Sequence, residues 1–368
     1  MQRIAIAFLI TFALVVAAAD VSSARIWHIR PDGTGDAPTI QAGIDSATAG
    51  DSVILSAGTY TGAGNRDIVF CGKAITVTSE SGPHVTIIDC QRLGRGFWFQ
   101  KGEGTSPVLS RVTIRNGFAS DGYGGGGIYC DRYSSPTISG NTINGNSSQQ
   151  DGGGIYCVES SDSILGNVIS NNSAQDGGGI LSTGCSSIIS GNVISGNSAQ
   201  DGGGIMYTVG GSSLILGNTI SGNTAQQRGG GIYCGMSWPT ISNNTLSGNS
   251  AASGGGIYCF YAGPPIQNTI IAFSSQGEGI FCGGSNPTLT SCDIYGNAGG
   301  DVLCGTDGGG NISADPLFCN PSAGDFYLHS GSPCVNNPGY GQIGAFGVGC
   351  GSTLTEETTW GHIKAMFR

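Results

Sequence analysis

The chain has 368 residues, of which 67 are glycine and 10% are charged, and its formal net charge is −10 at pH 7. From position 133 to position 363 the only side chain with a permanent positive charge is Arg228. Binding to nucleic acid or to an anionic membrane surface requires several cations on one face. The composition therefore argues against both kinds of partner.

The first 24 residues have the features of a signal peptide. Arg3 precedes an apolar and small-residue stretch from Ile4 to Ala19, and candidate cleavage sites follow at Ala17-Ala18-Ala19 and Ser22-Ser23-Ala24. An N-terminal membrane anchor is the alternative, but the apolar run is shorter than the roughly 20 residues that a spanning helix needs. We therefore expect an exported protein, secreted or associated with a cell surface, with no membrane span in its mature chain.

A Gly-x-Gly-Ile motif recurs through the middle of the chain, and an asparagine recurs in step with it. The spacings between the isoleucines are 27, 25, 25, 27, 25 and 23 residues: Ile128, Ile155, Ile180, Ile205, Ile232, Ile257 and Ile280. The asparagines are Asn141, Asn167, Asn192, Asn218, Asn244 and Asn268. Self-similarity at such a period is typical of a solenoid.

One repeat contains three short apolar segments separated by turn residues. The segments are Ile128 to Cys130, Thr137 to Ser139 and Thr142 to Ile143. Helical periodicity is absent, and each glycine in Gly152-Gly153-Gly154 would cost a helix about 1 kcal/mol relative to alanine. We therefore predict an all-β fold, a right-handed parallel β-helix, in which the asparagines form a hydrogen-bonded ladder.

Both ends of a solenoid need caps, because exposed strand edges can pair with other chains. Near the start, Ile40, Ile44 and Ala47 fall on one face of a predicted helix over 39–47. Near the end, the repeat decays into a cysteine-rich segment from Cys304 to Cys350. The predicted organisation is a signal peptide (1–24), a β-helix (25–350) with an N-terminal helical cap (25–60), regular repeats (122–300) and a Cys-rich C-terminal cap (301–350), and a tail (351–368).

Several motifs resemble those of a known family. The opening of bacterial pectate-lyase-like right-handed β-helix proteins is similar to Pro31-Asp32-Gly33, Thr39-Ile40-Gln41-Ala42-Gly43-Ile44, Ala49-Gly50-Asp51-Ser52-Val53 and Ala57-Gly58-Thr59-Tyr60. The Gly-Gly-Gly-Ile-Tyr repeats resemble polymorphic outer-membrane-protein type solenoids. The closing segment of exported β-helix proteins is similar to Asp315-Pro316-Leu317-Phe318-Cys319, Ser332-Pro333-Cys334 and Ile343-Gly344-Ala345. The resemblance implies fold and export, but the fold hosts binding proteins, lyases, hydrolases and epimerases.

An acidic column precedes the triple glycines of successive coils. It consists of Asp151, Asp176 and Asp201, and Arg228 takes the corresponding place in the next coil. A solvated column is tolerable, because each neighbouring repulsion in water is of order 1 kcal/mol, and Arg228 then forms a surface ion pair. Calcium binding by the three carboxylates is the alternative. The resemblance implies a further hypothesis, a calcium-dependent pectate-lyase-like enzyme with Arg228 as the base, although the lyase motif is not matched residue by residue.

Other catalytic and metal sites are not indicated by the sequence. Asp121, Asp131, Glu159 and Asp162 show no paired-carboxylate motif of a glycosidase, and the histidines lie outside the repeats, which argues against a nucleophilic triad. The absence of a CxxC pair argues against zinc. Calcium is therefore the one cofactor that the sequence raises, beside the expectation of none.

The residue after each repeat isoleucine is mostly aromatic and points outward if the isoleucine points inward. An external aromatic strip of this kind could stack on sugar rings or dock another protein. Alternatively, the rings stack on one another and stiffen the solenoid. The candidate residues for binding a glycan or another partner are Tyr129, Tyr156, Tyr207, Tyr233, Tyr258 and Phe281.

Thirteen cysteines in an exported chain favour disulfides. Buried, unbridged thiols are expected in the inward column Cys130, Cys157, Cys234, Cys259 and Cys282. Disulfides are expected among Cys304, Cys319, Cys334 and Cys350. In the tail, Trp360, Ile363 and Phe367 fall on one face of a short helix, which is either a frayed end or a recognition segment for export or surface attachment.

The function that the sequence favours is non-catalytic binding of a polysaccharide or a cell-surface component along the ladder faces of the β-helix. The aromatic strip, the monotonous repeats and the lack of a catalytic constellation support this interpretation. A polysaccharide lyase or related enzyme that acts on an acidic polysaccharide with calcium is the alternative.

Overall fold

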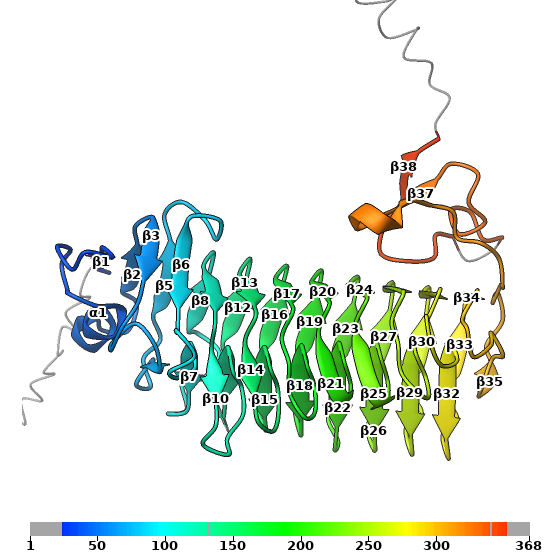
Figure 1. Cartoon of the computed structure of the whole chain (residues 1–368), viewed down its shortest axis with the longest axis horizontal. Coiled ribbons are helices and arrows are strands. Elements are labelled where there is room, and N and C mark those ends of the chain that lie inside the picture. Colours follow the sequence, from blue (N-terminus) through cyan, green and yellow to red (C-terminus); the bar gives the residue numbers. More distant parts are fainter. Residues whose placement is uncertain (1–23, 132, 339–340, 352–368) are drawn as a thin grey trace, which may run out of the picture.

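The computed structural model describes residues 24–131, 133–338 and 341–351. In this part of the chain the backbone winds into a parallel β-helix, as predicted, and successive turns contribute strands to three long parallel sheets, here called sheets A, B and C (Figure 1). Apart from residue 24, the predicted signal peptide lies outside the described residues, and so does the segment with Trp360, Ile363 and Phe367. No helix in the described ranges is long and apolar enough to cross a membrane.

The strands of each sheet stack in chain order. Sheet A contains β1 (Ile26–Ile29), β2 (Ser52–Leu55), β5 (Thr76–Ser79), β8 (Val108–Ser110), β12 (Thr137–Ser139), β16 (Ser163–Leu165), β19 (Ile188–Ser190), β23 (Leu214–Leu216), β27 (Thr240–Ser242), β30 (Pro265–Gln267), β33 (Thr288–Thr290) and β35 (Thr306–Asp307). Sheet B contains β3 (Gly58–Tyr60), β6 (Thr86–Asp89), β9 (Thr113–Arg115), β13 (Thr142–Asn144), β17 (Val168–Ser170), β20 (Val193–Ser195), β24 (Thr219–Ser221), β28 (Thr245–Ser247), β31 (Ile270–Ala272) and β34 (Asp293–Tyr295). Sheet C contains β4 (Ile68–Val69), β7 (Phe97–Phe99), β11 (Ile128–Cys130), β15 (Ile155–Val158), β18 (Ile180–Thr183), β22 (Ile205–Thr208), β26 (Ile232–Gly235), β29 (Ile257–Phe260) and β32 (Ile280–Gly283). Two further pairs lie on the return segments: β10 (Phe118–Ala119) with β14 (Ser147–Ser148), and β21 (Ser198–Asp201) with β25 (Thr224–Arg228).

The spacing of the sequence repeat sets the pairing of the strands. Each isoleucine of the Gly-x-Gly-Ile motif pairs with the isoleucine of the next coil, from Ile128 in β11 to Ile280 in β32. Inward columns of isoleucine also run through sheets A and B, where residues such as Ile189 and Ile194 are fully buried. The core is therefore a set of parallel columns that extends along the whole solenoid.

The triple glycines are required by close backbone approach at the returns that precede the sheet C strands from β11 to β29. A Cβ atom at Gly153 would lie 2.5 Å from the carbonyl oxygens of Gly178 and Ser173, which no side chain can tolerate. Gly152 has φ +58°, in the left-handed region that favours glycine. Substitution would separate the coils at this corner.

Two asparagine ladders, rather than one, run through the corners of the solenoid. In the predicted ladder, the Nδ2 of Asn141 donates to the Oδ1 of Asn167 at 3.1 Å, and the pattern continues to Asn244. Asn268 does not continue it, because Thr269 occupies the next position and its hydroxyl accepts from the Asn244 N–H at 3.4 Å. The second ladder, five residues further along each coil, was not predicted and consists of Asn146, Asn172, Asn197, Asn223 and Asn249.

Asn197 shows what each ladder residue does. Its Nδ2 donates to the backbone carbonyl of Ile169 at 2.9 Å, and its Oδ1 accepts from the backbone N–H of Asn172 at 3.0 Å. Both backbone groups are buried, so they have no access to water. The ladders therefore satisfy polar backbone groups at corners where the strands' own hydrogen bonds stop.

We predict that Asn197→Ala lowers the free energy of unfolding by about 2–4 kcal/mol, because it leaves a buried carbonyl and two buried N–H groups without partners. Chemical denaturation monitored by circular dichroism measures the change. The matched control is Asn144→Ser, in which an outward-facing asparagine takes the residue type of its neighbour in register, Ser170. Equal stability of the two variants would contradict the structural role of the ladder.

The N-terminal cap is confirmed as a short helix, α1 (Ile40–Ser46). The Thr39 hydroxyl caps it by accepting from the Ala42 N–H, and Ile40 and Ile44 are buried against the first coils. Sheets A and B already begin at β1 and β3, so stacked coils extend well before residue 122.

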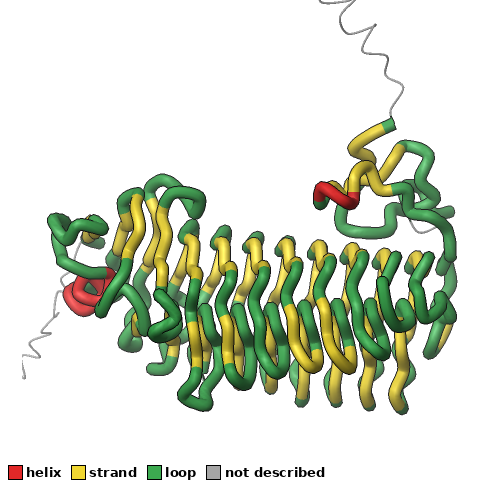
Figure 2. The backbone as a smooth tube through the Cα atoms, in the orientation of Figure 1, coloured by secondary structure: helices red, strands yellow, loops and turns green. Residues whose placement is uncertain are grey.

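The C-terminal segment forms a lobe that folds back over sheet B, above β24 and β28 (Figures 1 and 2). It comprises β36 (Phe318–Asn320), the 3-10 helix η1 (Pro321–Ala323), β37 (Asp325–His329) and β38 (Val348–Cys350). The Gly344 N–H donates to the Asn268 carbonyl at 2.7 Å, and the Ala345 N–H donates to the Thr245 hydroxyl at 3.0 Å. Apolar contacts between the lobe and sheet B join Leu328, Cys334 and Ile343 to Ile270 and Ala272.

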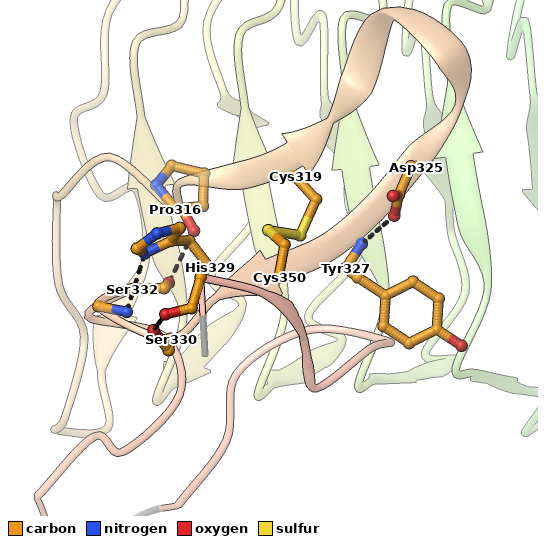
Figure 3. Close-up of a disulfide and its surroundings, with 10 residues drawn as sticks. Pro316, Cys319, Asp325, Tyr327, His329, Ser330, Ser332 and Cys350 are labelled. Carbon is orange, nitrogen blue, oxygen red and sulfur yellow. Dashed lines mark hydrogen bonds between the residues drawn. A yellow bond between two sulfur atoms is a disulfide. The ribbon is translucent and has the colours of Figure 1, made fainter. Parts of the chain in front are cut away.

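Two disulfides are present among the described residues. Cys319–Cys350 joins the outer strands of the lobe sheet (Figure 3), and Cys282–Cys304 ties the last strand of sheet C to the segment that leads into the lobe. The expectation of a free thiol at Cys282 is wrong, because the chain after β34 returns to within bonding distance of it. The expectation of a disulfide at Cys334 is also wrong, since its thiol is buried against sheet B and donates to the Asp293 carboxylate at 3.1 Å.

Candidate functional site

The acidic column is in the predicted register. Asp151 pairs with Asp176, and Asp176 pairs with Asp201, through isolated parallel bridges on the return segments. Burial, and after it the charges of Asp201 and Asp151, raise the pKa of Asp176 to about 6. The middle carboxyl of the column is therefore partly protonated near neutral pH.

Arg228 closes the column by a two-point ion pair with Asp201. The Arg228 Nε lies 3.0 Å from Asp201 Oδ1, and its Nη2 lies 2.5 Å from Oδ2. The guanidinium also lies over the rings of Tyr233 and Tyr258, at 5.6 and 5.9 Å from their centroids. Hydrogen bonding to Asp201 holds the pKa of Arg228 above its ordinary value. These contacts stabilise the protonated guanidinium and oppose a role as a base.

The column does not have the arrangement of a calcium site. Calcium takes six to eight oxygen ligands, but Asp201 already directs both carboxylate oxygens to Arg228. In the described part of the chain, the one cluster of three or more His, Cys, Asp or Glu whose ligand atoms all approach within 4.8 Å lies elsewhere, in the solenoid interior.

We predict that Asp176→Asn stabilises the protein at pH 8 by about 1 kcal/mol, by about half as much at pH 5, and has little effect at about pH 3.5. The folded pKa of about 6 lies above the ordinary value of 3.8, so the folded state binds the proton more tightly and stability is lost as the pH rises through about 6. The side-chain amide of the Asp176→Asn variant does not ionise, so the variant does not lose this stability as the pH rises. Thermal unfolding at these pH values measures the effect, and a calcium-dependent loss of stability in the variant would instead support a metal role.

The aromatic column is largely covered. Tyr129, Tyr233 and Tyr258 have only 5, 6 and 7% of their surface exposed. The Tyr258 ring stacks on Tyr233 at 5.3 Å and on Phe281 at 5.2 Å. The glycine returns lie against the bases of these side chains, so most of each outward ring faces protein rather than solvent. The rings therefore mainly stiffen sheet C, and only half-buried Tyr156 and Phe281 present more surface.

Tyr207 does not belong to the outward column. It is fully buried and pairs with Cys234, which places its side chain in the inward column, while Met206 takes the outward position beside Tyr233. Its hydroxyl donates to the Cys185 carbonyl and accepts from Ser213. The prediction that Tyr207 is available on the surface is wrong, because Tyr207 lies two positions after Ile205 in the strand and therefore shares its inward face.

The sequence analysis missed several exposed aromatic residues, two of which lie close together on the turns that lead out of sheet C. Trp238 and Tyr261, 57 and 62% exposed, lie on the turns between sheets C and A. A Cβ atom at Gly284 would lie 3.0 Å from the Tyr261 ring, so the ring lies across a glycine of the next coil. The sequence contained a signal for this arrangement, because Tyr261 precedes Gly284 by one repeat period.

A cleft of about 760 Å³ lies between sheet B and the C-terminal lobe. Its floor is the outer face of β20, β24 and β28, and its roof and one end are formed by the lobe and Phe273. The floor residues are Val193, Ser195, Gly196, Thr219, Ser221, Gly222, Ser247 and Gly248, and the lobe contributes Pro321, Gly324, Phe326 and Phe346.

The cleft combines hydroxyl groups with aromatic rings, and none of the described residues that line it is charged. Ser195, Ser221 and Ser247 occupy the same position in adjacent strands, so their hydroxyls recur at the strand spacing of roughly 4.8 Å. Opposite them, Phe346 packs against Tyr327, which is 46% exposed, with ring centroids 4.8 Å apart. Figure 3 shows the Tyr327 ring directed away from the Cys319–Cys350 disulfide. The disulfide thus holds together the lobe, which contributes Phe326 and Phe346 as the aromatic rim of the cleft.

The fold and the cleft define a right-handed β-helix with a ligand-sized cleft under a C-terminal lobe. The family model described as "Right handed beta helix region" matches residues 52–225, 126–278 and 179–337, and the chain belongs to this family.

A solved structure supports the same fold. The crystal structure of the pectate lyase Pel9A is similar over 90% of this chain and 98% of that chain, with 15% identity and a TM-score of 0.57. The catalytic domain of a GH87 alpha-1,3-glucanase in complex with nigerose shows 15% identity over 74% of this chain and 67% of that chain, with a TM-score of 0.39. No curated protein sequence matches the chain.

Proposed function

We propose that the protein is an exported, non-catalytic β-helix that binds a neutral glycan chain in the cleft between sheet B and the C-terminal lobe. The single observation that carries the proposal is the cleft itself, with a row of hydroxyl groups opposite an aromatic rim. Its volume lies within the range of about 300–1,000 Å³ that ligand sites commonly have. The two disulfides support an oxidising, extracellular setting.

The chemistry of the lining fits a sugar chain. The apolar faces of sugar rings pack on aromatic side chains such as Phe346 and Phe273, and sugar hydroxyls exchange hydrogen bonds with Ser221 and its neighbours in the column. An acidic polysaccharide would lose hydration of its carboxylates in the cleft without gaining a cationic partner there. The charge of the lining therefore favours a neutral glycan.

The lining also favours binding over cleavage. Hydrolysis by paired carboxylates requires two acidic groups around the bond, and within the described ranges no acidic residue lines the cleft. The lyase alternative requires a free base near the acidic column, whereas Arg228 is held protonated by Asp201. The neighbouring pectate lyase supports the fold of this chain, and the binding proposal rests on the cleft.

We predict that the purified protein is retained by neutral polysaccharides without depolymerising them, and that Phe346→Ala weakens retention about tenfold by loss of ring stacking. A panel of neutral and acidic polysaccharides, with calcium and with a chelator, measures both retention and cleavage. Chelator-sensitive cleavage of an acidic polymer would support the lyase alternative and overturn the proposal.

A matched pair of substitutions locates the site. Ser221→Arg places a long cationic side chain on the cleft floor, and Ser170→Arg places the same side chain in the same column two strands earlier, one strand outside the edge of the floor at Ser195. Only Ser221→Arg is expected to abolish retention. If Trp238→Ala lost retention while Ser221→Arg kept it, the glycan site would lie at the exposed aromatic turns and not in the cleft.

A further inference from the structure

One group of potential metal ligands is enclosed in the solenoid interior. The Sγ atoms of Cys130 and Cys157 and a carboxylate oxygen of Asp162 all lie within 4.8 Å of one another. All three side chains have no exposed surface. The cluster lies between β11, β15 and the start of β16, in coils that precede those of the cleft. It takes no part in the proposed glycan binding.

The repeat brings the three residues together. Cys130 and Cys157 pair in register on neighbouring strands of sheet C and point into the core. Asp162 lies in the same coil as Cys157, after the corner that leads out of β15, and it directly precedes β16. In the preceding and following coils, the residue before the paired strand is Pro136 or Ser187, so the buried carboxyl group is specific to this coil.

The Asp162 carboxyl group is only partly satisfied by the protein. The Ser160 hydroxyl donates to Oδ2 at 2.5 Å. The other oxygen, Oδ1, is fully buried and has no hydrogen-bond partner. A buried carboxylate oxygen without a partner is costly, and a bound cation is one of the few arrangements that offsets the cost.

We propose that Cys130, Cys157 and Asp162 form a binding site for a divalent cation of the zinc type. Two thiolates and one carboxylate suit a borderline-soft ion that prefers four ligands in tetrahedral geometry. The fourth position falls to the Ser160 hydroxyl or to a water molecule. Each thiol gives up its proton to solvent when the ion binds, and three anionic ligands then offset the two positive charges.

The same column contains a natural comparison. Cys234 and Cys259 also pair on neighbouring strands of sheet C and are fully buried, but the described chain brings no carboxylate to within the same distance of them. A pair of stacked thiols therefore occurs twice in sheet C, but only the Cys130–Cys157 pair has a carboxylate close enough to serve as a third ligand. The 27-residue separation of Cys130 and Cys157 follows the repeat period, which is why the absence of a CxxC pair led the sequence analysis away from zinc.

The test is the metal content of the full-length protein produced with zinc and dialysed against a weak chelator. Elemental analysis is expected to give about one zinc ion per chain. Cys157→Ser and Asp162→Asn are expected to reduce this at least tenfold, whereas the matched control Cys234→Ser is expected to retain the ion. Circular dichroism checks that each variant is folded.

Cobalt provides a readout that does not depend on the variants. Protein refolded with Co²⁺ in place of zinc is expected to show the absorption bands of a tetrahedral, thiolate-bound ion. Absence of these bands, a Cys130–Cys157 disulfide found by mass spectrometry of the unreduced protein, or equal loss of zinc in Cys234→Ser would each overturn the proposal. Glycan retention is measured in parallel, and its failure would bear on the cleft alone.

Discussion

The structure depends on each coil repeating the backbone path of the coil before it. Parallel strands satisfy their backbone groups only with neighbouring coils, so any corner where the path diverges would leave buried N–H and C=O groups without partners. The two asparagine ladders meet this requirement at the corners, because each amide reproduces the hydrogen bonds of a strand residue where the backbone turns. The glycine returns meet it differently, by allowing the backbones to approach within van der Waals contact.

This constraint explains why the fold could be predicted from the sequence. A fixed period forces equivalent residues into columns, so the spacing of the repeat isoleucines gave the strand register from Ile128 to Ile280 correctly. The first asparagine ladder followed in the same way. The second ladder has the same period, and Asn172 and Asn197 were available in the sequence, but serine-rich surroundings made them resemble ordinary turn residues.

The candidate site was much less predictable, because exposure depends on the path of the turns rather than on the period. Strand alternation placed Tyr129 and Tyr258 outward correctly, yet the glycine returns cover them. The cleft depends on the lobe, whose strands do not follow the repeat, and on contacts such as that between Ala345 and Thr245, 100 residues apart. No pattern in the repeats encodes where a non-periodic segment folds back.

The columns also indicate where chemistry can arise in a monotonous solenoid. A side chain that is identical in every coil is stabilised by its neighbours above and below, so it has little capacity left for a ligand. Chemistry becomes available where one coil departs from its column, as Arg228 does in the acidic column and Asp162 does at the corner before β16. In the first case the departure is neutralised within the chain by Asp201. In the second case an oxygen atom remains without a partner inside the core, and the two thiols beside it supply the ligands that a cation needs.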